Sequence, residues 1–164
     1  MQDEHCQPVS KALVETDGDI NKALDLLRAN SSLKAEKKAS RVAADGQLKI
    51  SINSDYVSLI EINSETDFAA KDEQFKTFAS DVAKYLESTK VHLVDDLNEQ
   101  FLKERHALIQ SIGENIQLRR LKTLDVAVGG SIGTYIHSDG KLAALVSIDT
   151  DNQELAKDLA MQVS

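Results

Sequence analysis

The chain has 164 residues, enough for one sizeable core or for a modest core with a small appended module. Aromatic residues make up 4% of it and tryptophan is absent, so its cores must be built from small aliphatic side chains. A net charge of −8 argues against general nucleic-acid binding, which needs a basic surface. Cys6 has no second cysteine to pair with, and the sequence shows neither a signal peptide nor a long apolar run. We therefore expect a cytoplasmic protein that binds other proteins and not membranes.

Two short helices are predicted within residues 1–30. Apolar residues recur at helical spacing before and after a break at Asp17-Gly18-Asp19; they are Val9, Ala12 and Leu13, then Ile20, Ala23, Leu24 and Leu27. A basic stretch with few apolar residues follows, and its cations are Lys34, Lys37, Lys38 and Arg41. This composition favours a solvated linker over residues 31–45, in part helical, rather than a binding patch.

Residues 46–125 predict a first core subdomain. Apolar and polar residues alternate from Leu48 to Ile52 and return from Tyr56 to Ile62 after an Asn-Ser-Asp turn, which indicates a β-hairpin. A helix is expected over about 72–87, where one face carries Phe75, Phe78, Ala79, Val82 and Leu86. A second helix is expected over about 94–112, with Gly113 ending it in the left-handed conformation. Alternation from Ile116 onward predicts a third strand.

The last part of the chain, residues 126–164, repeats the first subdomain. Two segments recur in order: Ile52-Asn-Ser-Asp55 as Ile136-His-Ser-Asp139, and Leu59-Ile-Glu-Ile-Asn63 as Leu145-Val-Ser-Ile-Asp149. In both copies a hairpin leads into an acid-flanked amphipathic helix, and Asp151 and Glu154 in the second copy have capping-box spacing. We expect an α+β fold, with a small helical N-terminal module and two related hairpin-plus-helix subdomains, the second cut short.

A polar corner joins the first hairpin to the helix that follows it. Ser64 and Thr66 within it suit a strand-to-helix turn or a helix N-cap. Phe68 comes before the periodic helix face has begun, so it either folds under the helix entry as a hydrophobic staple or lies exposed for a partner. The second copy of the repeat enters its helix without such an aromatic corner. The shared scaffold therefore does not require Phe68, which favours a functional role.

The residues around this corner resemble the elongation factor Ts family, the nucleotide-exchange factors of bacterial and organellar elongation factor Tu. Residues 61–71 read Glu-Ile-Asn-Ser-Glu-Thr-Asp-Phe-Ala-Ala-Lys, and Ala69 departs from the usual Thr-Asp-Phe-Val. Further matches follow in the family's order: Lys11-Ala-Leu13, Gly18-Asp-Ile20, Val42-Ala-Ala-Asp-Gly46, Ile112-Gly-Glu-Asn-Ile116, Arg119-Arg120 and His137. The resemblance implies a ubiquitin-associated-type module at residues 1–30, whose first helix we expect to be missing, and a duplicated core.

The resemblance also implies exchange of GDP for GTP on elongation factor Tu, in its GDP-bound and nucleotide-free forms. It assigns partner binding, and displacement of the partner's magnesium, to Thr66, Asp67, Phe68 and Ala69, with Phe68 as a wedge between partner helices. It assigns further partner contacts to Ile112, Gly113 and His137. Two rival interpretations are a plain adaptor, which leaves nucleotide release unchanged, and a truncated or decayed family member.

Residue patterns typical of bond-making catalysis are not found in the sequence. The histidines His5, His92, His106 and His137 share no metal-ligand spacing, and Gly129-Gly130-Ser131 lacks the lysine and helix start of a phosphate loop. Glu104, Glu114 and Asp125 are interpreted as solvated helix and loop charges. At least one of Arg119 and Arg120 is expected to face solvent or an acidic neighbour. We expect no metal, no cofactor and no direct contact with nucleic acid.

Overall fold

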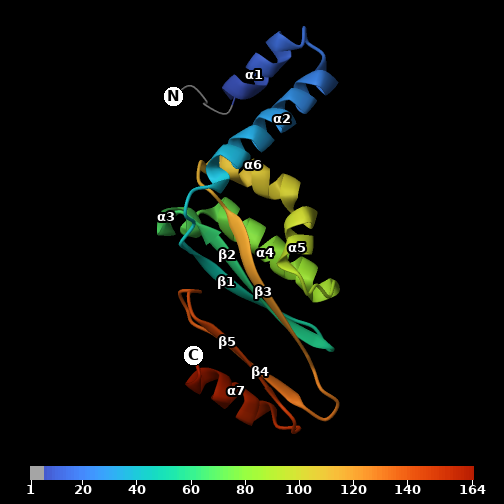
Figure 1. The fold of residues 1–164 in the computed structure, drawn as a ribbon, viewed down its shortest axis with the longest axis vertical. Helices are drawn as coiled ribbons and strands as arrows, with labels where there is room; N and C mark the ends of the chain where they lie inside the picture. The colour runs from blue at the N-terminus through green and yellow to red at the C-terminus, as the bar shows by residue number, and fades with distance from the viewer. Residues whose placement is uncertain (1–5) are drawn as a thin grey trace.

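The alternating segments of the sequence form two small antiparallel sheets, each covered by helices. The computed structural model describes residues 6–164, and the predicted α+β class is confirmed. The first sheet has the strand order β1 (Asp45–Ile52), β2 (Tyr56–Ser64) and β3 (Gln117–Asp125). The second pairs β4 (Ser131–Ile136) with β5 (Ala143–Ile148). Figure 1 shows the N-terminal helices, the first sheet and the second sheet following one another along the long axis.

The main core lies between the first sheet and the helices on one of its faces. Ile60 and Ile62 of β2 are fully buried, and α4 (Glu73–Ser88) lays its predicted apolar face on that side of the sheet. The fully buried members of that face are Phe75, Ala79, Val82 and Leu86. Asp72 caps the start of α4 by accepting a hydrogen bond from the Gln74 N–H at 2.8 Å. The predicted hairpin, third strand and helix face are therefore confirmed.

The helix predicted over about 94–112 is two helices, α5 (Val94–Gln100) and α6 (Leu102–Ile112). The break is at Phe101, whose backbone leaves the helical region and whose ring packs edge-to-face on Phe78 and Tyr85, at 5.9 and 5.5 Å between centroids. Aromatic packing therefore overrides continuous helix here. Gly113 ends α6 with φ 88°, in the left-handed conformation that was predicted.

The N-terminal helices are α1 (Cys6–Glu15) and α2 (Ile20–Ala39), and His5 lies outside the described residues. Of the segment predicted as a solvated and partly helical linker, residues 31–39 form the second half of α2, and Ala35 within them is buried in the main core. Lys34 and Lys37 of that half are exposed, as predicted, whereas Lys38 is half-buried and its Nζ would lie 3.8 Å from a Cβ at Gly113. The boundaries drawn at residues 30, 45 and 125 stay a prediction.

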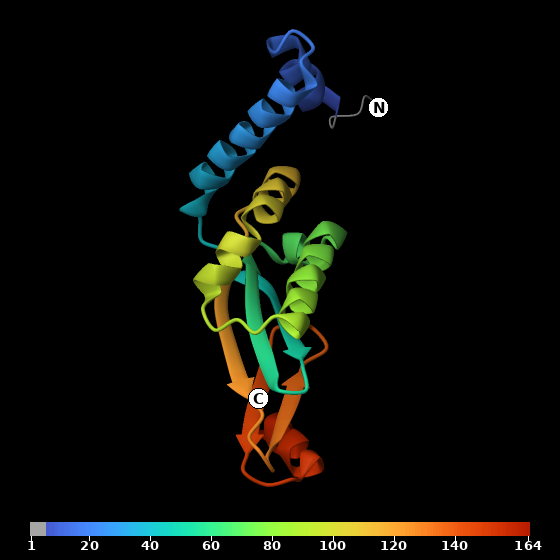
Figure 2. The same ribbon diagram turned by 90° about the vertical axis from the view of Figure 1, so that its right-hand side faces the viewer.

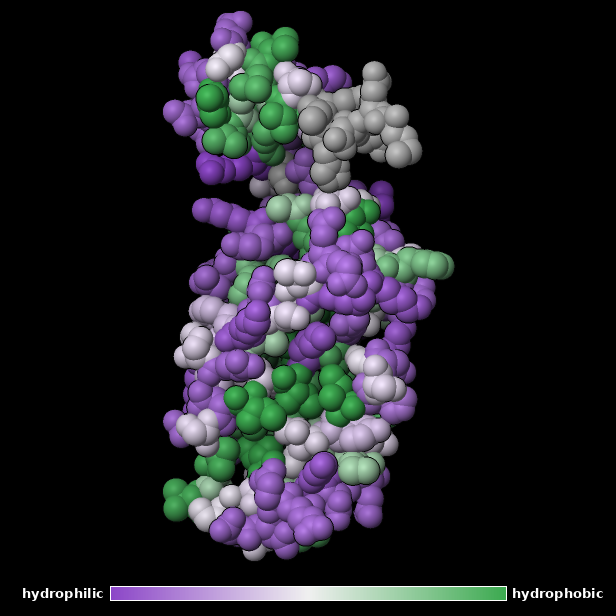
Figure 3. Space-filling model, turned by 180° about the vertical axis from the view of Figure 1, so that it is seen from behind, coloured by the Kyte–Doolittle hydropathy of each residue, from purple (hydrophilic) through white to green (hydrophobic). Residues whose placement is uncertain are grey.

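Large hydrophobic side chains remain exposed on the two N-terminal helices. They include Val9, Val14, Ile20 and Leu24. Figure 3 shows hydrophobic side chains gathered over these helices on the face seen from behind. This part of the molecule therefore buries little apolar surface for its length. None of the helices in residues 6–164 is long and apolar enough to cross a membrane.

The second subdomain packs α7 (Gln153–Gln162) onto β4 and β5. Ala156 and Ala160 of α7 are fully buried, and a side chain at Gly133 of β4 would come within 1.8 Å of the Ala156 carbonyl oxygen. Only glycine therefore allows this close approach of helix and strand. The helix is capped by Asn152, which accepts a hydrogen bond from the Leu155 N–H, so the capping box expected from Asp151 is wrong. The cap lies one residue later because it is the Asn152 side chain that accepts the Leu155 N–H, at 3.0 Å.

Candidate functional site

The polar corner between β2 and α4 contains a short helix, α3 (Asp67–Lys71). Thr66 is its N-cap, with an extended backbone and a hydroxyl that accepts a hydrogen bond from the Ala69 N–H at 3.3 Å. Ser64 is fully buried and donates its hydroxyl to the Thr66 carbonyl at 2.9 Å. The predicted turn and cap residues are thus confirmed, and they set the direction in which α3 leaves the sheet.

Phe68 is 81% exposed on α3. The hydrophobic staple is therefore the wrong interpretation. The next two residues, Ala69 and Ala70, are 4% and 3% exposed and face the protein. Small side chains thus dock α3 on the sheet while its aromatic residue is exposed to solvent.

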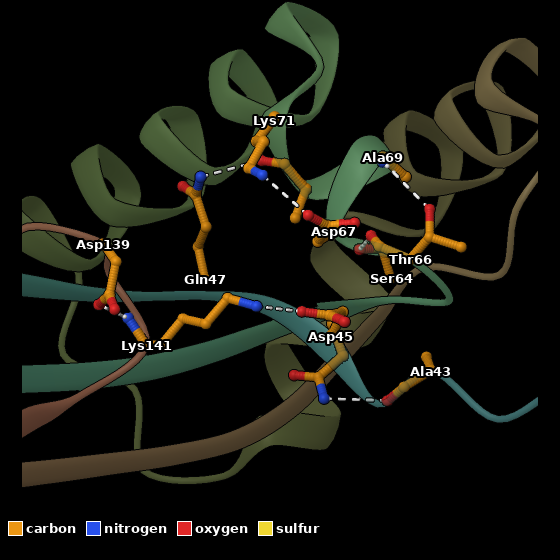
Figure 4. A network of polar contacts seen from close by, with 12 residues as sticks. Ala43, Asp45, Gln47, Ser64, Thr66, Asp67, Ala69, Lys71, Asp139 and Lys141 are labelled. Carbon is orange, nitrogen blue, oxygen red and sulfur yellow. Dashed lines mark hydrogen bonds and ion pairs between the residues drawn. The ribbon is translucent and has the colours of Figure 1, made fainter.

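Polar contacts along α3 hold the rest of the short helix (Figure 4). Asp67 forms an ion pair with Lys71 at 2.8 Å, and Gln47 of β1 donates its side-chain amide to the Ala70 carbonyl at 2.9 Å. The hydrogen bond from Lys71 holds the pKa of the Asp67 carboxyl below its usual value, and the charge of Lys141 acts in the same direction. Asp67 is therefore an exposed carboxylate kept ionised beside Phe68.

Two turns that are distant in the sequence are joined at the start of α3, because each contributes a carboxylate that accepts hydrogen bonds from the other. The Glu114 carboxylate accepts the Thr66 N–H at 2.9 Å and the Thr66 hydroxyl at 2.7 Å. In return, Glu65 accepts the Asn115 N–H at 2.7 Å. These contacts bring the turn that follows Ile112 and Gly113 directly against the turn that precedes Phe68. We call this pair of contacts the carboxylate clasp.

Glu114 is a partly exposed loop charge, as predicted, but its carboxylate is also bound by two donors of Thr66. Sequence reasoning missed Glu65 and Glu114 as members of the site. The partners lie 48 and 50 residues apart, and neither glutamate stands in a local pattern that indicates such a contact.

His137 lies in the turn between β4 and β5, in contact with Asp139 at 3.2 Å and about half exposed. Lys141 of the same turn forms an ion pair with Asp45 of β1, and the Leu48 N–H donates to the Gly140 carbonyl at 2.7 Å. This ion pair raises the pKa of Lys141. Figures 1 and 2 show α3 and this turn along the same edge of the molecule. The turn that contains His137 and the helix that contains Phe68 therefore lie along one edge.

The paired arginines of β3 both bind Glu61 of β2. Arg120 lies 2.5 Å from one carboxylate oxygen and Arg119 lies 3.4 Å from the other. The predicted acidic neighbour is therefore confirmed. Partial burial is the largest single influence on the pKa of Glu61 and raises it, but the hydrogen bonds from Arg120 and Asn63 and the charges of both arginines together outweigh it, so the pKa lies below its usual value. Within residues 6–164, no three His, Cys, Asp or Glu side chains gather in a way that could hold a metal ion.

Comparison with known proteins identifies relatives of the chain. The family model described as Elongation factor TS matches residues 65–164. The chain is 46% identical over 157 residues to elongation factor Ts of Hahella chejuensis, 44% over 158 residues to that of Teredinibacter turnerae and 40% over 162 residues to that of Thioalkalivibrio sulfidiphilus. Each alignment covers 94% of this chain but 54%, 54% and 55% of these relatives, respectively. The chain thus spans about half the length of the curated relatives it matches.

Proposed function

The chain belongs to the elongation factor Ts family, and we propose that it binds elongation factor Tu and promotes the exchange of GDP for GTP. The physical basis is linkage. A protein that binds the nucleotide-free partner more tightly than the GDP-bound partner must weaken GDP binding by the same factor. Such a protein need not make or break a covalent bond. The proposal places it in the cytoplasm, with elongation factor Tu.

The observation that carries the proposal is the exposure of Phe68. A large aromatic side chain that is 81% exposed contributes little to the fold, whereas aromatic anchors are typical of the centres of interfaces. In the proposed complex Phe68 enters between partner helices near the nucleotide, and Asp67 contacts the partner beside it. The resulting shift of the partner's loop displaces bound magnesium. Thr66 and Ala69 support the wedge from below.

Further contacts are proposed on both sides of the wedge. Ile112 and Gly113 are proposed to contact the partner beside it; support comes from the carboxylate clasp, which joins the two turns. His137 is proposed to contact another domain of the partner. Its turn lies along the same edge as α3, and its side chain is about half exposed. Two contact points on one edge suit a partner that is held by more than one domain.

Stopped-flow fluorescence of labelled GDP leaving elongation factor Tu tests the proposal. Release should accelerate with increasing concentration of the chain and then saturate. A chain that binds the partner, measured by calorimetry, but leaves the release rate unchanged would be an adaptor. A chain that neither binds nor accelerates release would be the decayed family member.

A further inference from the structure

We infer that Glu114 is a positioning residue for Phe68. By binding Thr66, it fixes the direction in which the Phe68 side chain points. The inference rests on the proposed function and adds to it a residue outside the aromatic corner. Glu114 is not proposed to touch the partner's nucleotide or magnesium. Its role is to fix the direction of the short helix that carries the wedge.

The aim of Phe68 must be set by the backbone of α3. The side chain is 81% exposed, so packing on its own protein restrains the ring little. The helix has five residues, far fewer than a helix needs to persist on its own. Groups that bind the ends of α3, together with the buried Ala69 and Ala70, therefore decide where Phe68 points.

Glu114 binds the beginning of α3 with both of its carboxylate oxygens. Oε2 accepts the Thr66 N–H at 2.9 Å and Oε1 accepts the Thr66 hydroxyl at 2.7 Å. Because the hydroxyl proton is directed at Glu114, the lone pairs of Thr66 Oγ1 are free to accept the Ala69 N–H at 3.3 Å. The carboxylate thus orients the Thr66 hydroxyl so that its oxygen can cap α3. Because the acceptor is charged, both hydrogen bonds from Thr66 to Glu114 are stronger than bonds to a neutral acceptor would be.

Glu114 can act this way because its own turn is fixed. Gly113 before it has the left-handed conformation that ends α6. Asn115 after it is 2% exposed, donates its N–H to Glu65 and donates its side-chain amide to the Arg41 carbonyl at 2.7 Å. The turn is therefore anchored on one side by α6 and on the other by the loop after α2. Through the clasp, Phe68 and the Ile112-Gly113 pair are held as one unit.

Exchange kinetics test the functional part of the inference. Glu114→Ala should lower saturating exchange by about fivefold, the factor that corresponds to loss of a helix N-cap. Thr66→Val should reproduce that loss, because it removes the hydroxyl that Glu114 binds. In a Phe68→Ala background, Glu114→Ala should change exchange less than about twofold, because the side chain that Glu114 positions is absent. Glu99→Ala on the exposed face of α5 is the matched control and should leave exchange unchanged. Full loss in the Phe68→Ala background as well would overturn the inference.

Fluorine NMR of the free protein tests the positioning itself, whatever the outcome of the exchange assay. The chain has four phenylalanines, so labelling with fluorophenylalanine gives few signals, and Phe68→Ala identifies the relevant one. Glu114→Ala should shift or broaden the Phe68 signal and leave Phe75, Phe78 and Phe101 unchanged. An unchanged Phe68 signal would overturn the inference even if the wild-type chain exchanges nucleotide. If Glu114→Ala alters all four signals, Glu114→Gln, which keeps the side-chain shape, must still move Phe68 alone, or the role is general stability. A wild-type chain that leaves GDP release unchanged would instead refute the proposed function.

Discussion

Replacing Phe68 with alanine should separate folding from exchange. Full burial of a phenylalanine side chain contributes roughly 1.5–3 kcal/mol, but Phe68 is 81% exposed, so about 0.5 kcal/mol or less is at stake in the free protein. Alanine also has the higher helix propensity, which offsets part of that loss. For a chain of this length the melting temperature should fall by no more than about 2 °C.

The exchange activity of the same variant should fall much further. A central aromatic anchor is worth about 2 kcal/mol or more at an interface. If all of that is lost from the transition state for GDP release, catalysed exchange slows roughly thirtyfold. Stopped-flow release of labelled GDP, measured on the sample used for melting, gives both quantities on one preparation.

Phe75→Ala is the matched control, because Phe75 is fully buried in the main core. It should cost about 3–5 kcal/mol of unfolding free energy, which is roughly 10 °C in melting temperature. Its surviving folded fraction should exchange normally. The reasoning about Phe68 is refuted if Phe68→Ala melts like Phe75→Ala while its folded fraction keeps full exchange.

Three further predictions concern neighbouring features. Asp67→Ala should slow exchange but lower the melting temperature only slightly, because its pair with Lys71 is solvent-exposed; a large stability loss by calorimetry would contradict this. Hydrogen exchange should show residues 6–30 opening more readily than the strand around Ile60, since the N-terminal helices leave large apolar side chains exposed, and equal protection would refute it. Burial lowers the pKa of His106 from 6.5, so the unfolded chain takes up a proton more readily and unfolding free energy should fall as pH drops through about 6.5; urea titrations at pH 7.5 and 5.5 should show a smaller drop in His106→Gln, and an identical drop would refute the assignment.

The parts of the fold that could be predicted are those set by local periodicity. Alternation along β1 and β2, the apolar face of α4 and the glycine that ends α6 each depend on residues close in sequence. The internal repeat then predicted the second hairpin and α7. These signals are strong because a strand or helix must turn its apolar side chains to one face.

The parts that were missed depend on contacts between distant residues. A single buried alanine, Ala35, extends α2 where composition indicates a linker, and the ring of Phe101 breaks a helix whose apolar period continues. The site shows the same division. Thr66 and Phe68 could be identified as candidates from the local sequence of the polar corner. The exposure of Phe68 and the hydrogen bonds between Thr66 and Glu114 depend instead on tertiary packing.

The carboxylate clasp also ties the presentation of Phe68 to the order in which the chain folds. Its contacts join residues 48 and 50 positions apart, and the intervening chain comprises α3, α4, α5 and α6. Closing so long a loop carries an entropic cost that the packing of these helices on the sheet must offset. The turn of Glu114 therefore meets Thr66 only once the first subdomain has assembled. A nascent or partly unfolded chain carries the same aromatic residue but lacks the contact that fixes the start of α3.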